Sequence, residues 1–317
     1  MKKRMVSILL TLALLAGMGG ALSVTARAQG EARLPTKKEL NAAWFKKRPS
    51  AEFNGDIALM AASLAMDESA FRERYGVPGK PLEMERFPAG TFIWGVENPH
   101  FKVGSIALGD ATLVVVKLDG SGAFGSGQYL VSNFIGYYGY AAQAAPYCCY
   151  RVEAGYRSYA DAVWETLGGL KSTFECKKNL KLLITGHSMG GAGANLLGVR
   201  LEKEGQIAGV KIDRKDIYVY AFESPNVYLD PCDPYAGAEF DNIYNFVNST
   251  DAAVLFMPGQ RFGKTYYFDL PDPERDFHHP TYAEYERAIG GTDPDSDTRR
   301  IWAANLFYSG VALLRSG

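Results

Sequence analysis

The sequence lacks an excess of charge of either sign. Its 317 residues include 34 Lys and Arg against 35 Asp and Glu, which gives a formal net charge of -1. A chain this close to neutrality has no long-range attraction for polyanions, and its basic residues are scattered, so we expect no nucleic-acid partner. The composition, 47% hydrophobic and 13% aromatic, is typical of a sizeable globular domain with a full core.

Long apolar runs are also lacking beyond the first part of the chain, so the mature protein is expected to be soluble. The exception is the segment MKKRMVSILLTLALLAGMGGALSVTARAQG. Its basic start, its apolar core and the small-x-small pattern Ala26-Arg27-Ala28 predict an export signal over residues 1–28, cut before Gln29. Such a protein is periplasmic or extracellular. An uncleaved membrane anchor is the alternative, although glycines interrupt the apolar core.

The chain has only four cysteines, Cys148, Cys149, Cys176 and Cys232. Their spacing matches no zinc site. Disulfides are expected in an exported protein, and because a bridge between neighbours is strained, Cys148 and Cys149 would each pair with Cys176 or Cys232. The connectivity stays open, as does the alternative of free thiols.

Metal-binding motifs are lacking as well. The run GTDPDSDTRR carries Asp293, Asp295 and Asp297 at alternate positions, as some calcium loops do. It lacks the glycine and the later glutamate of such loops, so we expect a turn, and neither a metal nor a cofactor is predicted.

Helical and strand patterns alternate along the rest of the chain. Helical spacing is found in SAEFNGDIALMAASLAMDESAFRERYG and GYRSYADAVWETLGGLKSTF, and strands are expected in TFIWGV, ATLVVVKLDGSG, DIYVYAFESPNV and NIYNFVNSTDAAVLF. The charged segment over residues 31–50 is expected to lie on the surface. No repeat or boundary interrupts the pattern, so residues 29–317 are predicted to form one α/β domain with a mostly parallel sheet.

The stretch KLLITGHSMGGAGANLLGVRL places Ser188 in a G-x-S-x-G pattern, between a strand expected over residues 180–185 and a helix expected to start near Gly191. A nucleophile elbow requires this order of strand, tight turn and helix, because its serine adopts a strained backbone conformation. Glycines beside the serine permit the close packing of such a turn. The helix N-terminus directs N–H groups towards an oxyanion, and the amide of Met189 is the expected donor. Ser188 is therefore the candidate nucleophile.

The chain contains only four histidines, so few residues can serve as the general base. Side chains next to the serine of an elbow point away from it, so His187 is expected to have a supporting role. The order serine, acid, histidine excludes His100 and leaves the doublet in DFHHPTYAEYERAI. His278 is the preferred base and His279 stays open as the alternative.

The acid is expected after a strand between Ser188 and the histidines. Asp251, which follows NIYNFVNST, fits this position and would orient the imidazole and stabilise its protonated form. Glu223 in AFESP, at the end of the preceding strand, is the rival. The loop aspartates are expected to be solvated or turn residues; they are Asp230, Asp233, Asp272 and Asp276.

These segments together resemble the class 3 lipase family of α/β-hydrolases. The resemblance is carried by LLITGHSMGGAGANLLGVRL, VYAFESPNV, NIYNFVNSTDAAVLFMP and HHPTYAEY, and less strongly by FNGDIALMAASLA and VEAGYRSYADAVWETL. It covers about residues 50 to 290. The resemblance implies an α/β-hydrolase fold with helices on both faces of the sheet, with Ser188 as nucleophile, Asp251 as acid and His278 as base.

Two positions depart from the family pattern. Relatives carry phenylalanine-arginine-glycine-threonine or serine where this chain has Leu118-Asp119-Gly120-Ser121. Ser121 keeps the hydroxyl that, with Met189, would form the oxyanion hole. Ala154-Gly155 stands where relatives often have histidine-glycine. The departures therefore concern the oxyanion side of the pocket.

Residues 122–145 are rich in glycine and then in aromatic residues. In class 3 lipases this part of the chain forms a lid, and a segment that is apolar on one side suits contact with a lipid surface. Aromatic side chains that simply pack on the core would give the same pattern, so both interpretations stay open.

The sequence thus predicts an exported serine ester hydrolase. The resemblance implies an acylglycerol or phospholipid substrate, and it leaves acyl-chain length and oligomeric state open. One alternative is an acyltransferase or peptidase with the same triad. Another is a non-catalytic lipid- or glycan-binding protein that kept the elbow, which the departure at Asp119 makes worth testing.

Overall fold

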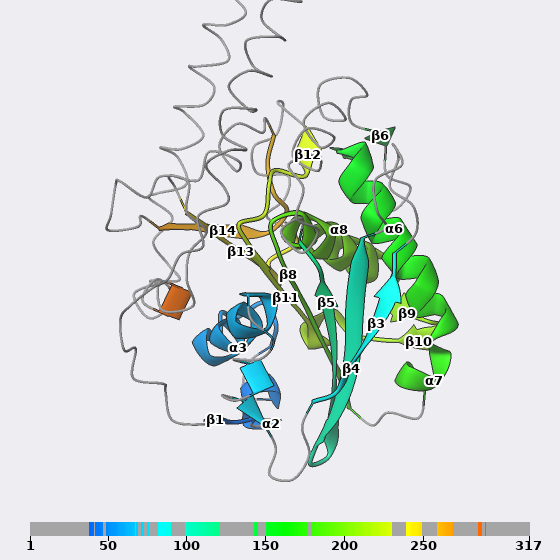
Figure 1. Ribbon diagram of the computed structural model, residues 1–317, viewed down its shortest axis with the longest axis vertical. Helices are drawn as coiled ribbons and strands as arrows, with labels where there is room; N and C mark the ends of the chain where they lie inside the picture. The colour runs from blue at the N-terminus through cyan, green and yellow to red at the C-terminus, as the bar shows by residue number, and fades with distance from the viewer. Residues whose placement is uncertain are drawn as a thin grey trace, which may run out of the picture.

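The computed structural model describes residues 38–40, 42–46, 49–66, 68, 71–72, 75–76, 82–89, 99–120, 143–144, 150–175, 179–229, 239–248, 259–268, 285–286 and 289. Its centre is a seven-stranded sheet (Figure 1). From one edge to the other, the strands are β14 (Lys264–Phe268), β13 (Ile243–Asn248), β11 (Ile217–Phe222), β8 (Leu180–His187), β5 (Ala111–Leu118), β4 (His100–Leu108) and β3 (Met84–Pro88). The strands from β5 to β14 pair in parallel, whereas β4 and β3 pair antiparallel. This confirms the predicted mostly parallel sheet.

Helices cover both faces of this sheet. Each parallel strand from β5 onwards is added beside the previous one in the same direction, so right-handed crossovers place their helices on one face. These helices are α6 (Ala154–Gly169) and α8 (Met189–Glu204), which pack on each other, and α8 also packs on β8 and β11. Helix α3 (Gly55–Met66) packs on the other side of β8 and β11 (Figure 1). The predicted α/β architecture, with helices on both faces of a mostly parallel sheet, is therefore confirmed.

Short elements complete the described chain. They are β1 (Lys38–Glu39), α2 (Ala42–Lys46), β2 (Tyr75–Gly76), β6 (Gln143–Ala144), β7 (Arg151–Val152), α7 (Lys171–Phe174), β9 (Gln206–Ile207), β10 (Val210–Lys211), η2 (Arg214–Asp216) and β12 (Tyr228–Leu229). β6, β7 and β12 form a small antiparallel sheet of their own. Its middle strand, β7, leads directly into α6.

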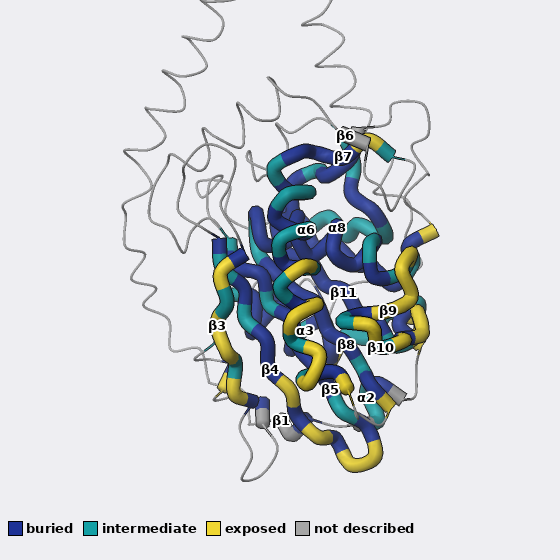
Figure 2. The backbone as a smooth tube through the Cα atoms, turned by 90° about the vertical axis from the view of Figure 1, so that its right-hand side faces the viewer, coloured by how far each residue is buried: buried dark blue, intermediate teal, exposed yellow. Residues whose placement is uncertain are grey.

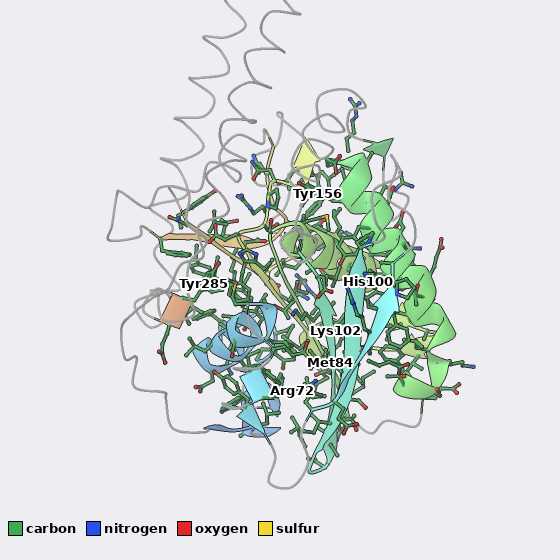
Figure 3. All side chains as sticks on the ribbon, in the orientation of Figure 1. Arg72, Met84, His100, Lys102, Tyr156 and Tyr285 are labelled. Carbon is green, nitrogen blue, oxygen red and sulfur yellow. The ribbon has the colours of Figure 1, made fainter. Side chains whose placement is uncertain are left out.

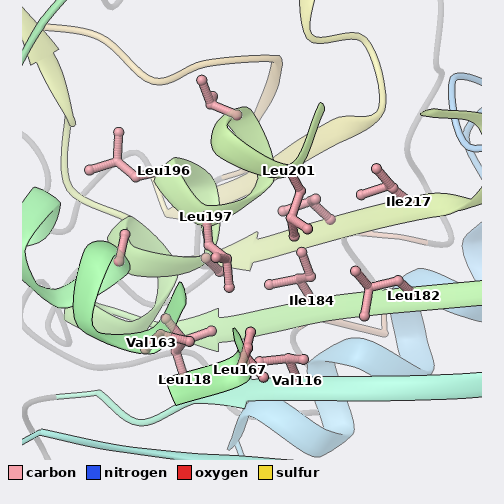
Figure 4. Packing of buried hydrophobic residues seen from close by; sticks show 14 of the residues in the cluster. Val116, Leu118, Val163, Leu167, Leu182, Ile184, Leu196, Leu197, Leu201 and Ile217 are labelled. Atoms are coloured by element: carbon pink, nitrogen blue, oxygen red, sulfur yellow. The ribbon is translucent and has the colours of Figure 1, made fainter. Parts of the chain in front are cut away.

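The core is split by the sheet into two layers, as the continuous burial along the central strands indicates (Figure 2). Successive side chains of a strand point to opposite faces, so each central strand contributes to both layers. Figure 4 shows the layer beneath α8, where Val116, Ile184 and Leu182 meet Leu197 and Leu201. The other layer packs against α3 and is rich in aromatic side chains.

The observed elements extend the predicted ones at two places. β8 continues to His187, and α8 begins at Met189, two residues before the predicted start. The surface position expected for residues 31–50 is wrong for part of that segment. Leu40 and Phe45 are buried, and the ring of Phe45 packs edge-on against Tyr218 at 5.2 Å. Leu40 and Phe45 belong to the aromatic layer of the core, although charged residues flank both in the sequence.

Several predictions concern residues outside the described part of the chain. These are the export signal, the strand in TFIWGV, the four cysteines, the Asp293 run and most of residues 122–145, of which only β6 is described. Among the described residues, no helix has the length and apolar character needed to cross a membrane. Within the same residues, no group of His, Cys, Asp or Glu side chains could hold a metal ion.

Candidate active site

The carboxyl ends of the parallel strands bring the candidate residues to one edge of the sheet. Neighbouring strands are paired at or near their carboxyl ends: Leu118 with Gly186, and Phe222 with both His187 and Phe246. Ser188 follows β8 directly, and Glu223 follows β11 directly. Strand order and register thus place the candidate nucleophile beside the residue that was the rival acid.

Ser188 occupies a strained turn between β8 and α8. Its φ of 55° and ψ of -123° lie in a region that residues with a side chain rarely adopt. The Ser188 amide donates a hydrogen bond to the Phe222 carbonyl at 2.9 Å, and its carbonyl accepts one from the Ala192 amide at 3.1 Å. Strand, tight turn and helix are therefore fixed together around the serine, which is the geometry expected of a nucleophile elbow.

Glycines allow this turn to pack against its surroundings. A Cβ atom on Gly186 would overlap the carbonyl oxygen of Gly190, and one on Gly190 would overlap that of Leu118. On Gly191 it would lie 2.9 Å from the Phe222 carbonyl oxygen. All three obstacles are backbone atoms, which cannot rotate away. The glycines of GHSMGG are thus explained by contact between backbones rather than by their own torsion angles.

The chain that follows β5 passes directly beside the serine. A Cβ atom on Gly120 would lie 2.5 Å from the His187 carbonyl oxygen and 3.7 Å from the Ser188 Cβ atom. Ser121, the proposed oxyanion donor, is the next residue but lies outside the described part of the chain. The geometry up to Gly120 is compatible with a donor at this position.

Asp119 replaces the arginine expected from the family pattern, and it is 7% exposed. Its carboxylate oxygens lie 3.9 Å from Lys117 Nζ and 4.0 Å from Arg86 Nε. Its amide donates to the His100 carbonyl at 3.1 Å. Two cations next to this carboxylate offset part of the cost of its burial, so the departure is accommodated locally.

Tyr159, which lies in the predicted helical segment GYRSYADAVWETLGGLKSTF, holds this region in place. The hydroxyl of Tyr159 on α6 lies 2.7 Å from the His100 carbonyl oxygen and 3.2 Å from that of Asp119. It therefore connects α6 to the ends of β4 and β5 (Figure 3 labels His100). A tyrosine at a fully buried helix position is the signal that could have indicated a hydrogen-bonded contact.

Glu153 stabilises the start of α6. Its carboxylate accepts a hydrogen bond from the Tyr156 amide at 2.7 Å, and its own amide donates to the Val227 carbonyl at 2.9 Å. Burial raises the pKa of the Glu153 carboxyl above its ordinary value, while the bonds from the helix amides act in the opposite direction. This N-cap immediately precedes Ala154-Gly155, the second departure from the family pattern.

The oxyanion side of the elbow also includes the start of α8. Met189 is its first residue and is 1% exposed. The first amides of a helix have no acceptor within the helix, and the helix dipole favours negative charge at this end. His187, the last residue of β8, is partly buried. Their expected roles, oxyanion donor and support residue, stay predictions.

Glu223 is tightly constrained by its surroundings. It is 1% exposed and has a positive φ of 46°. Its Oε1 and Oε2 atoms accept hydrogen bonds from the backbone amide of Asn248 at 3.0 and 3.1 Å. Oε1 also accepts a hydrogen bond from the Tyr285 hydroxyl at 3.0 Å. The carboxylate thus joins the ends of β11 and β13 to Tyr285.

The described residues bring together Ser188, Met189, Gly120 and Glu223. Asp251, His278, His279 and Ser121 lie outside the described part of the chain, as do the four loop aspartates expected to be solvated or turn residues. Described residues flank the proposed acid and base. Asn248 lies three positions before Asp251, and Tyr285 lies seven positions after His278.

Residues 126–261 match the family described as Lipase (class 3). The chain therefore carries a region similar to class 3 lipases. This region includes Ser188, Glu223 and Asp251 and ends before the histidine doublet. The lipase match assigns the chain to the carboxylic ester hydrolases. No curated protein matches the sequence.

Solved lipase structures share the fold of this chain. A lipase from Rhizopus microsporus var. chinensis aligns with a TM-score of 0.50 at 15% identity, over 81% of this chain and 92% of the other. The M37 lipase gives a TM-score of 0.50 at 14% identity, over 75% and 94%. A Rhizomucor miehei lipase in complex with its propeptide gives 0.46 at 18% identity, over 68% of each chain. At these identities the first two similarities establish the fold only.

Proposed function

We propose that this protein is an exported serine ester hydrolase, a lipase that cleaves acylglycerols or phospholipids through Ser188, His278 and Asp251. The observation that carries the proposal is the backbone of Ser188, with φ of 55° between β8 and α8. Strain of this kind persists only where the surrounding structure enforces it, and it presents a serine hydroxyl at the carboxyl edge of the sheet. The lipase region that surrounds the serine supports the same reaction class.

In the proposed reaction, Ser188 Oγ attacks the carbonyl carbon of the ester while His278 accepts its proton. Asp251 orients the imidazole and stabilises the imidazolium. The Met189 amide and Ser121 bind the oxyanion of the tetrahedral intermediate. His278 then gives the proton to the leaving alcohol, and a water molecule, activated by the same imidazole, hydrolyses the acyl-enzyme and restores the serine.

Access of the substrate is proposed to involve residues 122–145 as a lid. A lid that opens at a lipid surface would raise the rate above the micellar concentration of the substrate. Export through residues 1–28 would place the enzyme where such lipids are encountered.

The test compares protein from Gln29 onward with Ser188→Ala on p-nitrophenyl esters of short and long acyl chains. We expect hydrolysis to fall by at least about 1,000-fold in the variant, as in other serine hydrolases, and a fluorophosphonate to label the wild type alone. A rate increase above the micellar concentration would support a lidded lipase. Equal inactivity of both proteins on every ester would favour the non-catalytic binding protein, and transfer to alcohols faster than hydrolysis would favour an acyltransferase.

A further inference from the structure

Two features of Glu223 each destabilise the folded protein unless other interactions compensate for them. The first is a carboxylate that is only 1% exposed, and the second is a positive φ of 46°, which a glycine would adopt without strain. The side chain must therefore contribute something that a glycine cannot. The hydrogen bonds of its carboxylate are that contribution.

The bonds of Glu223 join three parts of the chain that are distant in sequence. The Asn248 amide is 25 residues away and the Tyr285 hydroxyl 62 residues away. Ring contacts support the second connection, since Tyr285 packs edge-on against Phe222 at 5.0 Å and against Phe268 at 5.5 Å. Tyr285 lies in the layer of the core that contains α3 (Figure 3).

These two partners flank the other members of the proposed triad. Asn248 ends β13 three residues before Asp251, and Tyr285 follows His278 by seven residues and His279 by six. Glu223 itself follows Phe222, whose carbonyl accepts the hydrogen bond from the Ser188 amide. One buried carboxylate is thus connected to the chain segments next to the nucleophile, the acid and the base.

We infer that Glu223 is a positioning residue that fixes the segments carrying Asp251 and the catalytic histidine relative to Ser188. This inference rests on the proposed triad. The rival role, Glu223 as the acid itself, would require its carboxylate to serve an imidazole in addition to Asn248 and Tyr285. Displacement of a catalytic group by about 1 Å can reduce the rate about 100-fold, so a small shift of either segment would suffice to impair the reaction.

Substitutions at position 223 separate the two roles. Glutamine can accept from the Asn248 amide with its oxygen and donate to the Tyr285 hydroxyl with its nitrogen, so it preserves both contacts without charge. We expect Glu223→Gln to keep kcat within about threefold of wild type. We expect Glu223→Ala and Glu223→Gly to lose about 100-fold in kcat, with KM changed less than about threefold. Glycine relieves the strain of the positive φ at position 223, whereas alanine retains it. A similar loss of kcat in both variants would therefore show that the missing carboxylate causes the loss.

Tyr285→Phe removes one bond and retains the ring, and it provides a milder test if the alanine variant folds poorly. We expect kcat to fall about tenfold to thirtyfold, which is the effect of one hydrogen bond to a charged group, at an unchanged far-ultraviolet circular dichroism spectrum.

Two results would overturn the inference. A loss of about 10,000-fold in Glu223→Gln would show that the charge is required and would make Glu223 the acid. Wild-type kcat in folded Glu223→Ala and in Tyr285→Phe would show that the connection is not needed. Ser188→Ala and Asp251→Asn are measured in parallel, because full activity in these two variants would instead refute the proposed function.

Discussion

The two faces of the central sheet are packed in different ways along β11 and β13. Beneath α8 these strands present aliphatic side chains, Ile217, Val219 and Ile243. On the opposite face they present aromatic ones, namely Tyr218, Tyr220, Phe222, Tyr244 and Phe246. One face lets a helix approach closely, and the other fills a wider space with rings that can also donate hydrogen bonds.

Close approach on the first face depends on glycines in α8. A Cβ atom on Gly198 would lie 2.8 Å from Val219 Cγ2 and 3.2 Å from Ile243 Cδ1. On Gly193 it would lie 2.8 Å from Leu118 Cδ2. The helix that begins directly after Ser188 is therefore held against the strands over its length, which fixes the position of the elbow.

The aromatic face holds α2 and the segment around Ser50 that precedes α3. Tyr218 donates to the Phe45 carbonyl at 2.8 Å, and Tyr244 donates to the Ser50 carbonyl at 3.1 Å. The rings of Tyr220 and Tyr244 stack at 5.2 Å. Burial raises the pKa of the Tyr244 hydroxyl above its ordinary value, so it stays a neutral donor. On this face the strands make their contacts through side-chain rings and hydroxyls, whereas at the elbow backbone atoms are in contact.

The largest expected effect comes from Gly190→Ala, because the added methyl group would overlap the carbonyl oxygen of Leu118. The end of β5 and the elbow would have to separate. We expect kcat/KM on p-nitrophenyl esters to fall at least about 100-fold and stability to fall by about 3 kcal/mol, measured by urea unfolding. Unchanged activity would show that backbone contact at the elbow is not needed.

A smaller effect is expected from Gly198→Ala in the middle of α8. Overpacking against Val219 costs about 1–3 kcal/mol, and the better helix propensity of alanine returns about 1 kcal/mol, so a net loss of about 1 kcal/mol is expected. Gly168→Ala is the matched control, since a Cβ atom at this helix position in α6 meets nothing within 4 Å. Urea midpoints should fall for the first variant and rise for the control. Equal gains in both would contradict close packing of α8.

On the aromatic face, Tyr244→Phe should cost about 1 kcal/mol, because the ring stays and only the bond to the Ser50 carbonyl is lost. Tyr220→Phe is the comparison, since the Tyr220 hydroxyl lies 3.4 Å from the Asn54 carbonyl oxygen, near the limit of a hydrogen bond. We expect a smaller loss in urea unfolding and no change in kcat for either. If neither variant loses stability, the hydroxyls do not hold the segment and the rings alone do.

Sequence patterns predicted the central elements well where the signal was local. The apolar runs of β5, β8, β11 and β13 and the helical spacing of α3, α6 and α8 were all predicted. β3, β4 and β14 were not expected. β3 is mostly exposed. β14 is half-buried throughout, and β4 mixes buried and exposed residues, so neither gives a continuous apolar run. Phe45 was assigned to the surface because charged neighbours surround it.

Within the candidate site, the sequence by itself determined the strand, the turn at Ser188 and the glycines beside it, because all of them lie within a few residues of one another. The tertiary structure alone decided that Gly120 lies against His187 and that Glu223 binds Asn248 and Tyr285. These contacts depend on strand order and register, which bring together residues far apart in the chain. Periodicity reports which face of an element is buried, but not which distant element covers it.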